Sequence, residues 1–261
     1  MFRLCEATDG FIREALGTSD PVRAQFELAA EDYAERIGGL QKRYPKNGLV
    51  KSLFREALER VGVEIDRTYW DLLRLRAFPH SEGPPENGLG RLGVHRDTWS
   101  SNIYAQTNWW APVYQITAGR TIAFYPAYWS QPIENTSASW SLGKVRAARR
   151  AGDSSVPVVP GLAEDLDPAT EVRVVIEPGD LLCFSGAHLH AGVPNSTGLA
   201  RFSIETRTVD ADDAAAATGA PNVDGAAAEE HPQWFSRVAD GAPLAVAGGR
   251  TGETFRGRRV E

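Results

Sequence analysis

The second half of the chain contains two strand-like segments separated by a short turn, and this arrangement restricts the fold more than any other feature. Residues 181–190 and 200–209 are rich in apolar and β-forming residues. A Pro-Gly-Asp turn at 178–180 precedes the first segment, and a Pro-Asn-Ser-Thr-Gly turn at 194–198 joins it to the second. Neighbouring strands joined by such a turn pair as an antiparallel hairpin. The chain is therefore predicted to contain an antiparallel β core.

The register of this hairpin brings polar side chains together. If the turn is centred between Ser196 and Thr197, His190 lies opposite Ser203. Arg201 then lies on the same face, about 7 Å further along the strand. The hairpin is thus predicted to bring an imidazole, a hydroxyl and a guanidinium to one side of the sheet.

The rest of the chain is predicted to form a single domain of residues 1–261 around this core. Hydrophobic residues recur at helical spacing between 20 and 61, so residues 1–65 are predicted to be a helical buttress on one sheet. Strand-like patterns predominate over 66–209, the predicted β core. Residues 210–261 begin with an Ala-, Asp- and Gly-rich stretch and are predicted to be a partly irregular tail. The predicted fold class is mainly β with flanking helices.

Composition excludes several classes of protein. The chain is 42% hydrophobic and 24% charged, as globular proteins are, and its net charge of -6 argues against a nucleic-acid surface. It lacks an apolar run long enough for a membrane span and an N-terminal signal sequence, so we expect a cytoplasmic protein that binds a small molecule, as a monomer or homodimer. Cys5 and Cys183 form neither a disulfide framework nor a Cys-x-x-Cys zinc motif.

The triplet His95-Arg96-Asp97 is a candidate metal site. Residues two apart on a strand point to the same face, so this imidazole and carboxylate are able to bind one metal. A solvated ion pair on a surface strand would give the same triplet. The triplet by itself does not decide between the two interpretations.

His190 would complete the site. Two histidines and one carboxylate form the facial triad expected of non-haem Fe(II) oxygenases, and no thiolate is present to favour zinc. Three coordination positions remain, two for a 2-oxo acid and one for O2. Arg201 and Ser203 would bind the far carboxylate of the oxo acid, because a guanidinium can make two parallel hydrogen bonds to it. Considered alone, Arg201 is better explained as a strand-end salt bridge with Glu205 or Asp180, and the nearby triad reverses that preference.

Together these motifs resemble the phytanoyl-CoA dioxygenase-like family of Fe(II)/2-oxoglutarate-dependent oxygenases. The resemblance covers roughly residues 70–209. It consists of His95-x-Asp97, then His190 about ninety residues later with Pro-Asn close behind, and Arg201 eleven residues after His190. His188 competes with His190 for the metal, but the eleven-residue spacing and the hairpin register favour His190. His188 would then lie opposite Glu205.

The resemblance implies a double-stranded β-helix, a jelly-roll or cupin-like barrel with the metal at its mouth. It implies Fe(II), 2-oxoglutarate and O2, and it places Trp110 near the oxo acid, although core packing explains this tryptophan equally well. Related iron halogenases have a small residue in place of the carboxylate, so Asp97 implies hydroxylation or a similar oxidation. Gly192 stands where the family frequently has serine, and Tyr125–Ser130 replaces its Gly-rich loop, so the resemblance does not imply a substrate class.

Four residues are candidate substrate contacts: Trp99, Gln106, Asn108 and Arg76. Gln106 and Asn108 would share a strand face with Asp97 if alternation holds. Arg76, like Arg74, is more typical of a solvated edge strand, and the basic cluster at 144–150 is more typical of solvated surface. The segments 79–93 and 130–160 are predicted to close over the pocket.

The sequence therefore predicts an Fe(II)/2-oxoglutarate-dependent dioxygenase. It would oxidise a small-molecule metabolite, by default through hydroxylation, while 2-oxoglutarate is decarboxylated to succinate. Two alternatives stay open: a cupin-like metalloenzyme that does not use 2-oxoglutarate, and a non-catalytic small-molecule-binding barrel. Loss of oxo-acid binding in Arg201→Ala would argue against the first alternative, and metal analysis would test the second.

Overall fold

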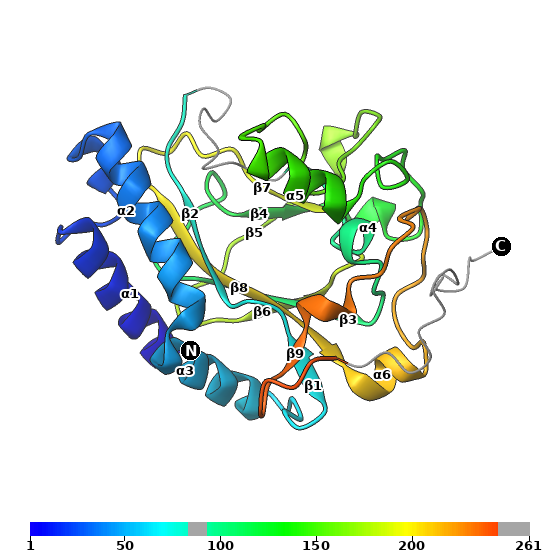
Figure 1. The fold of residues 1–261 in the computed structure, drawn as a ribbon. Helices are drawn as coiled ribbons and strands as arrows, with labels where there is room; N and C mark the ends of the chain where they lie inside the picture. Colours follow the sequence, from blue (N-terminus) through cyan, green and yellow to red (C-terminus); the bar gives the residue numbers. More distant parts are fainter. Residues whose placement is uncertain (83–92, 245–261) are drawn as a thin grey trace.

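Three N-terminal helices form one side of the molecule (Figure 1), in a computed structural model that describes residues 1–82 and 93–244. They are α1 (Phe2–Leu16), α2 (Ala30–Arg43) and α3 (Gly48–Arg60). The first ends at Gly17, whose φ of 70° is a left-handed cap that glycine adopts without steric cost. The third begins after Asn47, whose side chain accepts hydrogen bonds from the backbone N–H groups of Leu49 and Val50. Helix α1 lies within the predicted helical buttress of residues 1–65, but outside the stretch 20–61 whose hydrophobic spacing carried that prediction.

The larger sheet has six strands, in the order β6-β3-β8-β1-β9 with β2 also paired to β8. All pairings are antiparallel, and β8 is the central strand that contacts β3 on one side and β1 and β2 on the other. The strands are β1 (Thr68–Trp70), β2 (Arg74–Phe78), β3 (Gln106–Pro112), β6 (Leu182–Ser185), β8 (Arg201–Asp210) and β9 (Ser236–Arg237).

A second, three-stranded sheet has the order β5-β4-β7. Its strands are β4 (Ile122–Phe124), β5 (Val172–Val174) and β7 (His190–Gly192). Within residues 1–82 and 93–244 neither sheet closes on itself. The architecture is therefore mixed, with antiparallel sheets and flanking helices. Three short helices are α4 (Thr98–Ser101), α5 (Leu142–Arg150) and α6 (Ala211–Ala215).

The N-terminal helices pack against the larger sheet, as the predicted buttress requires. Their buried faces and one face of the sheet form a single hydrophobic cluster, which includes Ile12, Ile37 and Phe54 from the helices and Phe202 and Ile204 from β8. Phe54 and Ile204 are fully buried. Each such side chain contributes about 1.5–3 kcal/mol when removed from water. Figure 1 shows these helices on one side of the larger sheet and the small sheet with α5 on the other.

The predicted hairpin between 181–190 and 200–209 is wrong. The first segment is divided into β6 and β7, and β7 lies in the small sheet, where His190 pairs with Phe124. Ser203 on β8 pairs instead with Arg76 and Pro112 in the larger sheet. The connecting segment crosses from one sheet to the other and is not a hairpin turn.

Local hydrogen bonds hold this crossing segment in place. The side-chain amide of Asn195 donates to the carbonyls of Phe78 and Leu199, at 3.0 and 2.8 Å. The backbone N–H of Ala200 donates to the carbonyl of Val22 at 2.7 Å. Phe78 and Val22 lie far away along the chain, so the turn-like sequence here is held as a link between the two sheets.

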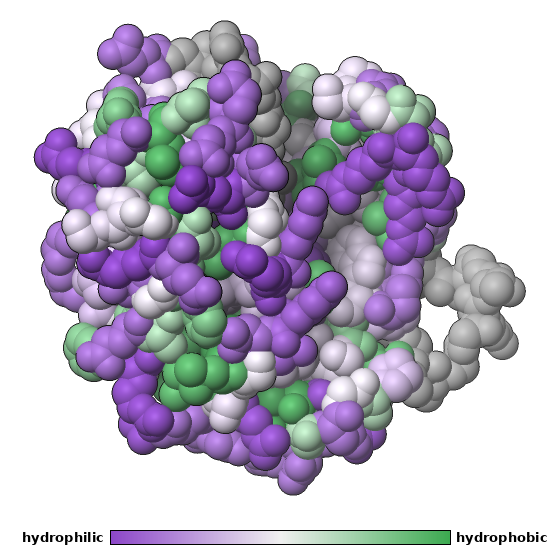
Figure 2. Space-filling view, turned by 60° about the vertical axis from the view of Figure 1, so that its left-hand side comes forward, coloured by the Kyte–Doolittle hydropathy of each residue, from purple (hydrophilic) through white to green (hydrophobic). Residues whose placement is uncertain are grey.

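Part of the predicted irregular tail is ordered against the larger sheet. Strand β9 pairs with β1, and Phe235 is buried against Tyr69 and Val209. Residues 245–261 lie outside the described residues, as do residues 83–92 of the predicted closing loop. Hydrophilic residues cover most of the face that Figure 2 presents. None of the helices in the described ranges has the length and apolar character that crossing a bilayer requires.

Candidate metal centre

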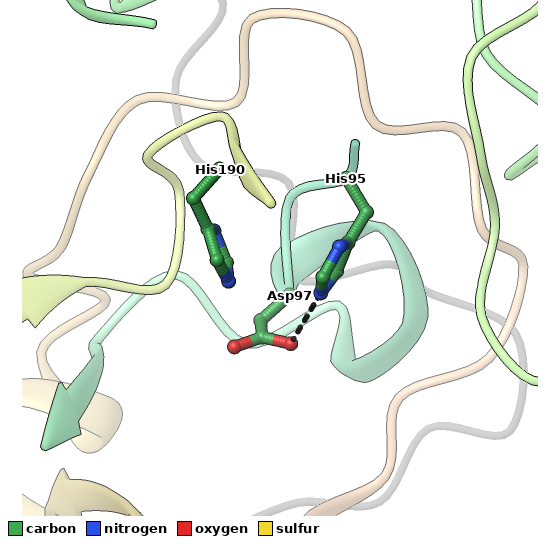
Figure 3. Close-up of side chains that lie close together, drawn as sticks. All are labelled: His95, Asp97 and His190. Carbon is green, nitrogen blue, oxygen red and sulfur yellow. Dashed lines mark ion pairs between the residues drawn. The ribbon is translucent and has the colours of Figure 1, made fainter. Parts of the chain in front are cut away.

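Three side chains converge at one point between the two sheets. The nearest ligand atoms of His95, Asp97 and His190 lie within 4.8 Å of one another. Nε2 of His95 is 3.5 Å from Oδ1 of Asp97, and the two imidazole centroids are 4.5 Å apart. Figure 3 shows both rings and the carboxylate turned toward a common centre. The three ligands predicted from sequence are therefore brought together.

The local geometry that joins them differs from the prediction. His95 and His190 form an isolated antiparallel bridge, with each backbone N–H donating to the other's carbonyl at 3.0 Å. Asp97 does not lie on a strand with His95. It is the first residue of the turn into α4, with φ -63° and ψ -30°, and its carbonyl accepts from the N–H groups of Ser100 and Ser101. The prediction that His95 and Asp97 share one face of a strand is therefore wrong. A bridge at His95 followed by a helical turn at Asp97 brings the two side chains together instead.

Both histidines are oriented through the ring nitrogen that faces away from the centre. Nδ1 of His95 lies 2.8 Å from the carbonyl of Gly93, and Nδ1 of His190 lies 2.9 Å from the carbonyl of His188. A carbonyl only accepts, so each Nδ1 carries a proton, and Nε2 is left as the nitrogen that could bind a metal. Metal-binding histidines are held in this way.

Asp97 is held as a carboxylate. Its Oδ2 accepts from the side-chain amide of Asn108 at 2.5 Å, and Arg207 approaches Oδ1 to 4.0 Å. Burial by itself would raise the pKa of this carboxyl, but the contact with His95 and the charge of Arg207 outweigh it and hold the pKa well below its usual range. Asn108 is fixed in turn by the amide of Gln106, which donates to its Oδ1 at 2.8 Å.

His190 is held as a neutral imidazole. Burial and then the neighbouring His95 lower its pKa to about 4, although Asp97 opposes the shift. The cluster therefore offers two imidazole nitrogens and one carboxylate oxygen. This donor set suits a divalent first-row metal such as iron.

The three ligands open into a cleft of about 710 Å³. Aromatic and aliphatic side chains from both sheets and from the 140–159 segment form much of its wall. The cleft also contains three carboxylates, Asp71, Asp97 and Glu205, and six arginines: Arg74, Arg76, Arg146, Arg149, Arg201 and Arg207. This volume suits a small organic molecule.

Arg201 reaches the cleft from the start of β8 as a buried cation. It is 4% exposed, and within the described ranges no carboxylate lies at ion-pair distance from its guanidinium. One terminal nitrogen donates to the carbonyl of Thr121, and the guanidinium carbon lies 4.0 Å from the centre of the Phe78 ring. Nε has no hydrogen-bond partner among the residues that the structure describes. Burial lowers its pKa to about 10, so it remains charged at neutral pH.

Ser203 and Trp110 lie close to this arginine. Ser203 follows Arg201 on the same face of β8, is fully buried, and its hydroxyl has no partner among the described residues. The ring of Trp110 lies 5.9 Å from the Arg201 guanidinium and lines the cleft. A Cβ atom at Gly192 would lie 3.5 Å from that guanidinium, in ordinary contact. Arg201 thus lines the cleft, whereas Ser203 is not among the described residues that line it.

The predicted substrate residues occupy different places. Asn108 and Arg76 line the cleft, and Arg76 donates to Glu205 at 2.5 Å. Gln106 lies behind Asn108 and does not line the cleft. Trp99 is fully buried in a separate hydrophobic cluster, and its ring N–H donates to Asp224 at 2.7 Å.

His188 does not lie opposite Glu205, and that part of the prediction is wrong. Its ring packs at a tilt against Trp129, with centroids 4.4 Å apart, and it does not belong to the cluster of His95, Asp97 and His190. The reason is the same as for the hairpin, since β7 and β8 belong to different sheets. Glu205 is instead paired with Arg76 inside the cleft.

Two site residues, Asp71 and Arg207, are not indicated by the motifs. Two nitrogens of Arg207 donate to Oδ2 of Asp71, and Arg74 approaches the same oxygen to 3.0 Å. Arg201, Glu205 and Arg207 alternate along one face of a strand whose other face is apolar. That alternation of charged residues along a core strand is the sequence signal that could have identified Arg207.

No protein-family model matches the sequence, and no curated protein matches it. Solved structures are similar to it. The non-haem monooxygenase ThoJ is 17% identical over 60% of this chain and 52% of its own, with a TM-score of 0.40. EvdO2 from Micromonospora carbonacea var. aurantiaca, complexed with 2-oxoglutarate, is 14% identical over 66% of this chain and 64% of its own, at 0.41. The non-haem α-ketoglutarate-dependent carbocyclase SnoK from nogalamycin biosynthesis is 14% identical over 64% and 60%, at 0.41.

The chain thus spans 52% to 64% of the length of these three proteins. Their identities and TM-scores are too low to carry an argument about the activity of this chain. The residues of the cleft indicate the chemistry that this chain can perform.

Proposed function

We propose that the chain is a non-haem Fe(II)- and 2-oxoglutarate-dependent oxygenase. One observation carries the proposal: a cluster of two histidines and a carboxylate shares a cleft with a buried arginine that pairs with no carboxylate among the described residues. A metal ion alone does not explain the arginine. A co-substrate with a carboxylate at its far end explains both features.

The three ligands would hold the iron. His95, Asp97 and His190 each present one donor atom, and the orienting bonds of Gly93, His188 and Asn108 fix the donors without occupying them. Three protein ligands leave positions for the co-substrate and O2. When bound, Fe(II) with 2-oxoglutarate and O2 supplies the oxidation of a substrate C–H bond, with succinate and CO2 as the products of the co-substrate.

Arg201 would bind the far carboxylate of 2-oxoglutarate. Its Nε and the hydroxyl of Ser203 are buried and have no hydrogen-bond partner among the described residues, so the co-substrate would supply a partner to both. Trp110 would line the same side of the site. Arg201 and Ser203 would orient the oxo acid toward the metal, and the ring of Trp110 would shield the oxo acid from water.

The wider assignments follow from this proposal. We propose a double-stranded β-helix with the metal between its two sheets, a single domain over residues 1–261, and similarity to the phytanoyl-CoA dioxygenase-like family. The reaction would be hydroxylation or a related oxidation of a small molecule, carried out in the cytoplasm by a monomer or homodimer. Asn108 and Arg76 are the substrate candidates that line the cleft.

The test combines metal binding and co-substrate turnover. Anaerobic protein is loaded with one equivalent of Fe(II), and succinate formed from 2-oxoglutarate is measured after O2 is added. We expect succinate from the wild-type protein, none from His190→Ala, and wild-type amounts from the matched variant His188→Ala, which removes the neighbouring histidine that packs against Trp129. Iron binding without succinate formation across a broad substrate panel would indicate a metalloenzyme that uses no oxo acid. Absence of iron binding would indicate a binding protein, and either result contradicts the proposal.

A further inference from the structure

The cleft carries an excess of positive charge that the metal and 2-oxoglutarate together would not neutralise. Among the described residues, six arginines and three carboxylates line it, so these nine side chains sum to +3, in a chain whose net charge is -6. A divalent metal and a doubly charged oxo acid cancel each other and leave this excess unchanged. Positive charge concentrated in a cleft of an acidic protein favours an anionic ligand.

Four of the six arginines already have partners or a proposed role. Arg74 and Arg207 share Asp71, and Arg76 is paired with Glu205. Arg201 is assigned to the co-substrate. These four side chains therefore balance charges within the site or bind 2-oxoglutarate.

Arg146 and Arg149 are different. Both are exposed, and neither makes an ion pair with a carboxylate in the part of the chain that the structure describes. Both line the cleft from helix α5, whose residues Leu142 and Val145 line it as well. These four positions are spaced i, i+3, i+4 and i+7, so one continuous face of the helix looks into the cleft. Val145 is buried and anchors that face.

The surroundings of the two arginines are apolar. Side chains from α5 and its flanking segments, together with the C-terminal segment, line this part of the cleft: Trp140, Leu142, Val145, Val158, Val159 and Trp234. A ligand here would place an apolar body against these side chains and a negatively charged group at the two guanidinium groups. A planar guanidinium is suited to oxyanions through paired hydrogen bonds.

We propose that the primary substrate is a small molecule with an apolar body and an oxyanion group, such as a carboxylate, sulfonate or phosphate, which Arg146 and Arg149 bind. This inference rests on the proposed function, because it names the substrate class of that same cleft. The basic cluster predicted as solvated surface thus divides into two parts. Arg146 and Arg149 face the cleft, whereas Lys144 and Arg150 do not line it.

The experiment uses two fluorescent probes that differ in charge. 8-Anilino-1-naphthalenesulfonate has an apolar body with a sulfonate, and N-phenyl-1-naphthylamine has the same rings without it. Each probe is titrated into the full chain, first without metal and then with saturating Ni(II) and 2-oxoglutarate. The variants are Arg146→Gln, Arg149→Gln and the matched control Arg150→Gln, which removes the neighbouring arginine that does not line the cleft.

We expect each cleft-facing substitution to raise the dissociation constant of the anionic probe about fivefold, and both together about 20-fold. Arg150→Gln and the neutral probe should change by less than about twofold. Equal affinity of the anionic probe for the wild-type protein and the double variant would overturn the inference. An equal loss for the neutral probe would mean that the arginines only pack against the rings, and an equal loss in Arg150→Gln would mean non-specific attraction. Either outcome also overturns it.

The two hypotheses can fail separately. If Ni(II) and 2-oxoglutarate do not bind, the proposed function is wrong, and the substrate assignment that rests on it is wrong as well. The probe titrations in the metal-free protein then still measure whether α5 binds an anion. If they bind and the arginine variants have no effect on the anionic probe, the inference alone fails. Circular dichroism of each variant checks that α5 and the fold are retained.

Discussion

Replacing Arg201 with methionine separates the effect of this buried cation on the stability of the fold from its effect on the binding of 2-oxoglutarate. The guanidinium is 4% exposed, has no carboxylate partner among the described residues, and has its pKa lowered to about 10 by burial. Desolvating an ion that is not paired costs several kcal/mol. Against that stand the hydrogen bond to the carbonyl of Thr121, worth about 1.5–3 kcal/mol, and the stacking on Phe78, worth about 0.5–2 kcal/mol.

These contributions nearly cancel, and methionine retains much of the side-chain volume. We therefore expect Arg201→Met in the metal-free protein to have a free energy of unfolding equal to that of the wild type or up to about 2 kcal/mol higher. Binding of 2-oxoglutarate should respond oppositely. Loss of two charge-assisted hydrogen bonds, about 1.5 kcal/mol each at least, weakens affinity by roughly 100-fold or more.

Two measurements check this. Urea unfolding of the metal-free protein, followed by tryptophan fluorescence, gives the stability, and calorimetric titration of 2-oxoglutarate into anaerobic Ni(II)-loaded protein gives the affinity. Arg150→Met, an exposed arginine outside the cleft, is the control and should change neither. The reasoning is refuted if Arg201→Met lowers stability by more than about 2 kcal/mol, or if it binds 2-oxoglutarate within about threefold of the wild type.

Three further predictions concern the ligands and the core. Asn108→Leu removes the amide that donates to Asp97 and should weaken Ni(II) binding about 10- to 100-fold by calorimetry; unchanged affinity would show that the amide does not position the carboxylate. Below pH 6.5 His190 takes up a proton in the unfolded chain, whereas in the folded chain it does so only at about pH 4. The unfolding free energy of the metal-free protein should therefore fall as the pH is lowered through this range, by roughly 3 kcal/mol at most. His190→Phe should make the plot of unfolding free energy against pH flatter. Phe54→Ala should lower the urea-unfolding free energy by about 3–5 kcal/mol, and the core account fails if it also abolishes Ni(II) binding in the folded state.

The chemistry of the candidate centre could be predicted from the sequence because it depends on residue types that have few alternative uses together. His95, Asp97 and His190 are a donor set, and the set remains the same whichever elements carry it. Arg201 followed by Ser203 is a local pattern, and residues two apart on a strand share a face in any sheet. Helices α2 and α3 also follow from local periodicity, since their apolar faces must be buried against another part of the chain.

The pairing of strands could not be predicted in the same way. A turn-like sequence at 194–198 predicts a hairpin, yet Asn195 bonds to Phe78 and Leu199 and the chain crosses between sheets. Which strand pairs with β7 is decided by the summed burial and hydrogen bonding of the whole domain. Phe124, the partner of His190, lies far away along the chain, and no local signal connects the two residues.

The sequence by itself therefore determined which atoms are available to a metal and to an oxo acid, because donor type is a property of the residue. Only the tertiary structure decided what surrounds them. In the folded chain Asp97 lies at the start of helix α4, and Glu205 and Arg207 line the cleft. Some basic side chains of α5 line the cleft, and the others lie outside the cleft. The physical reason is that burial and unpaired charge arise from contacts between distant segments, and local sequence does not encode those contacts.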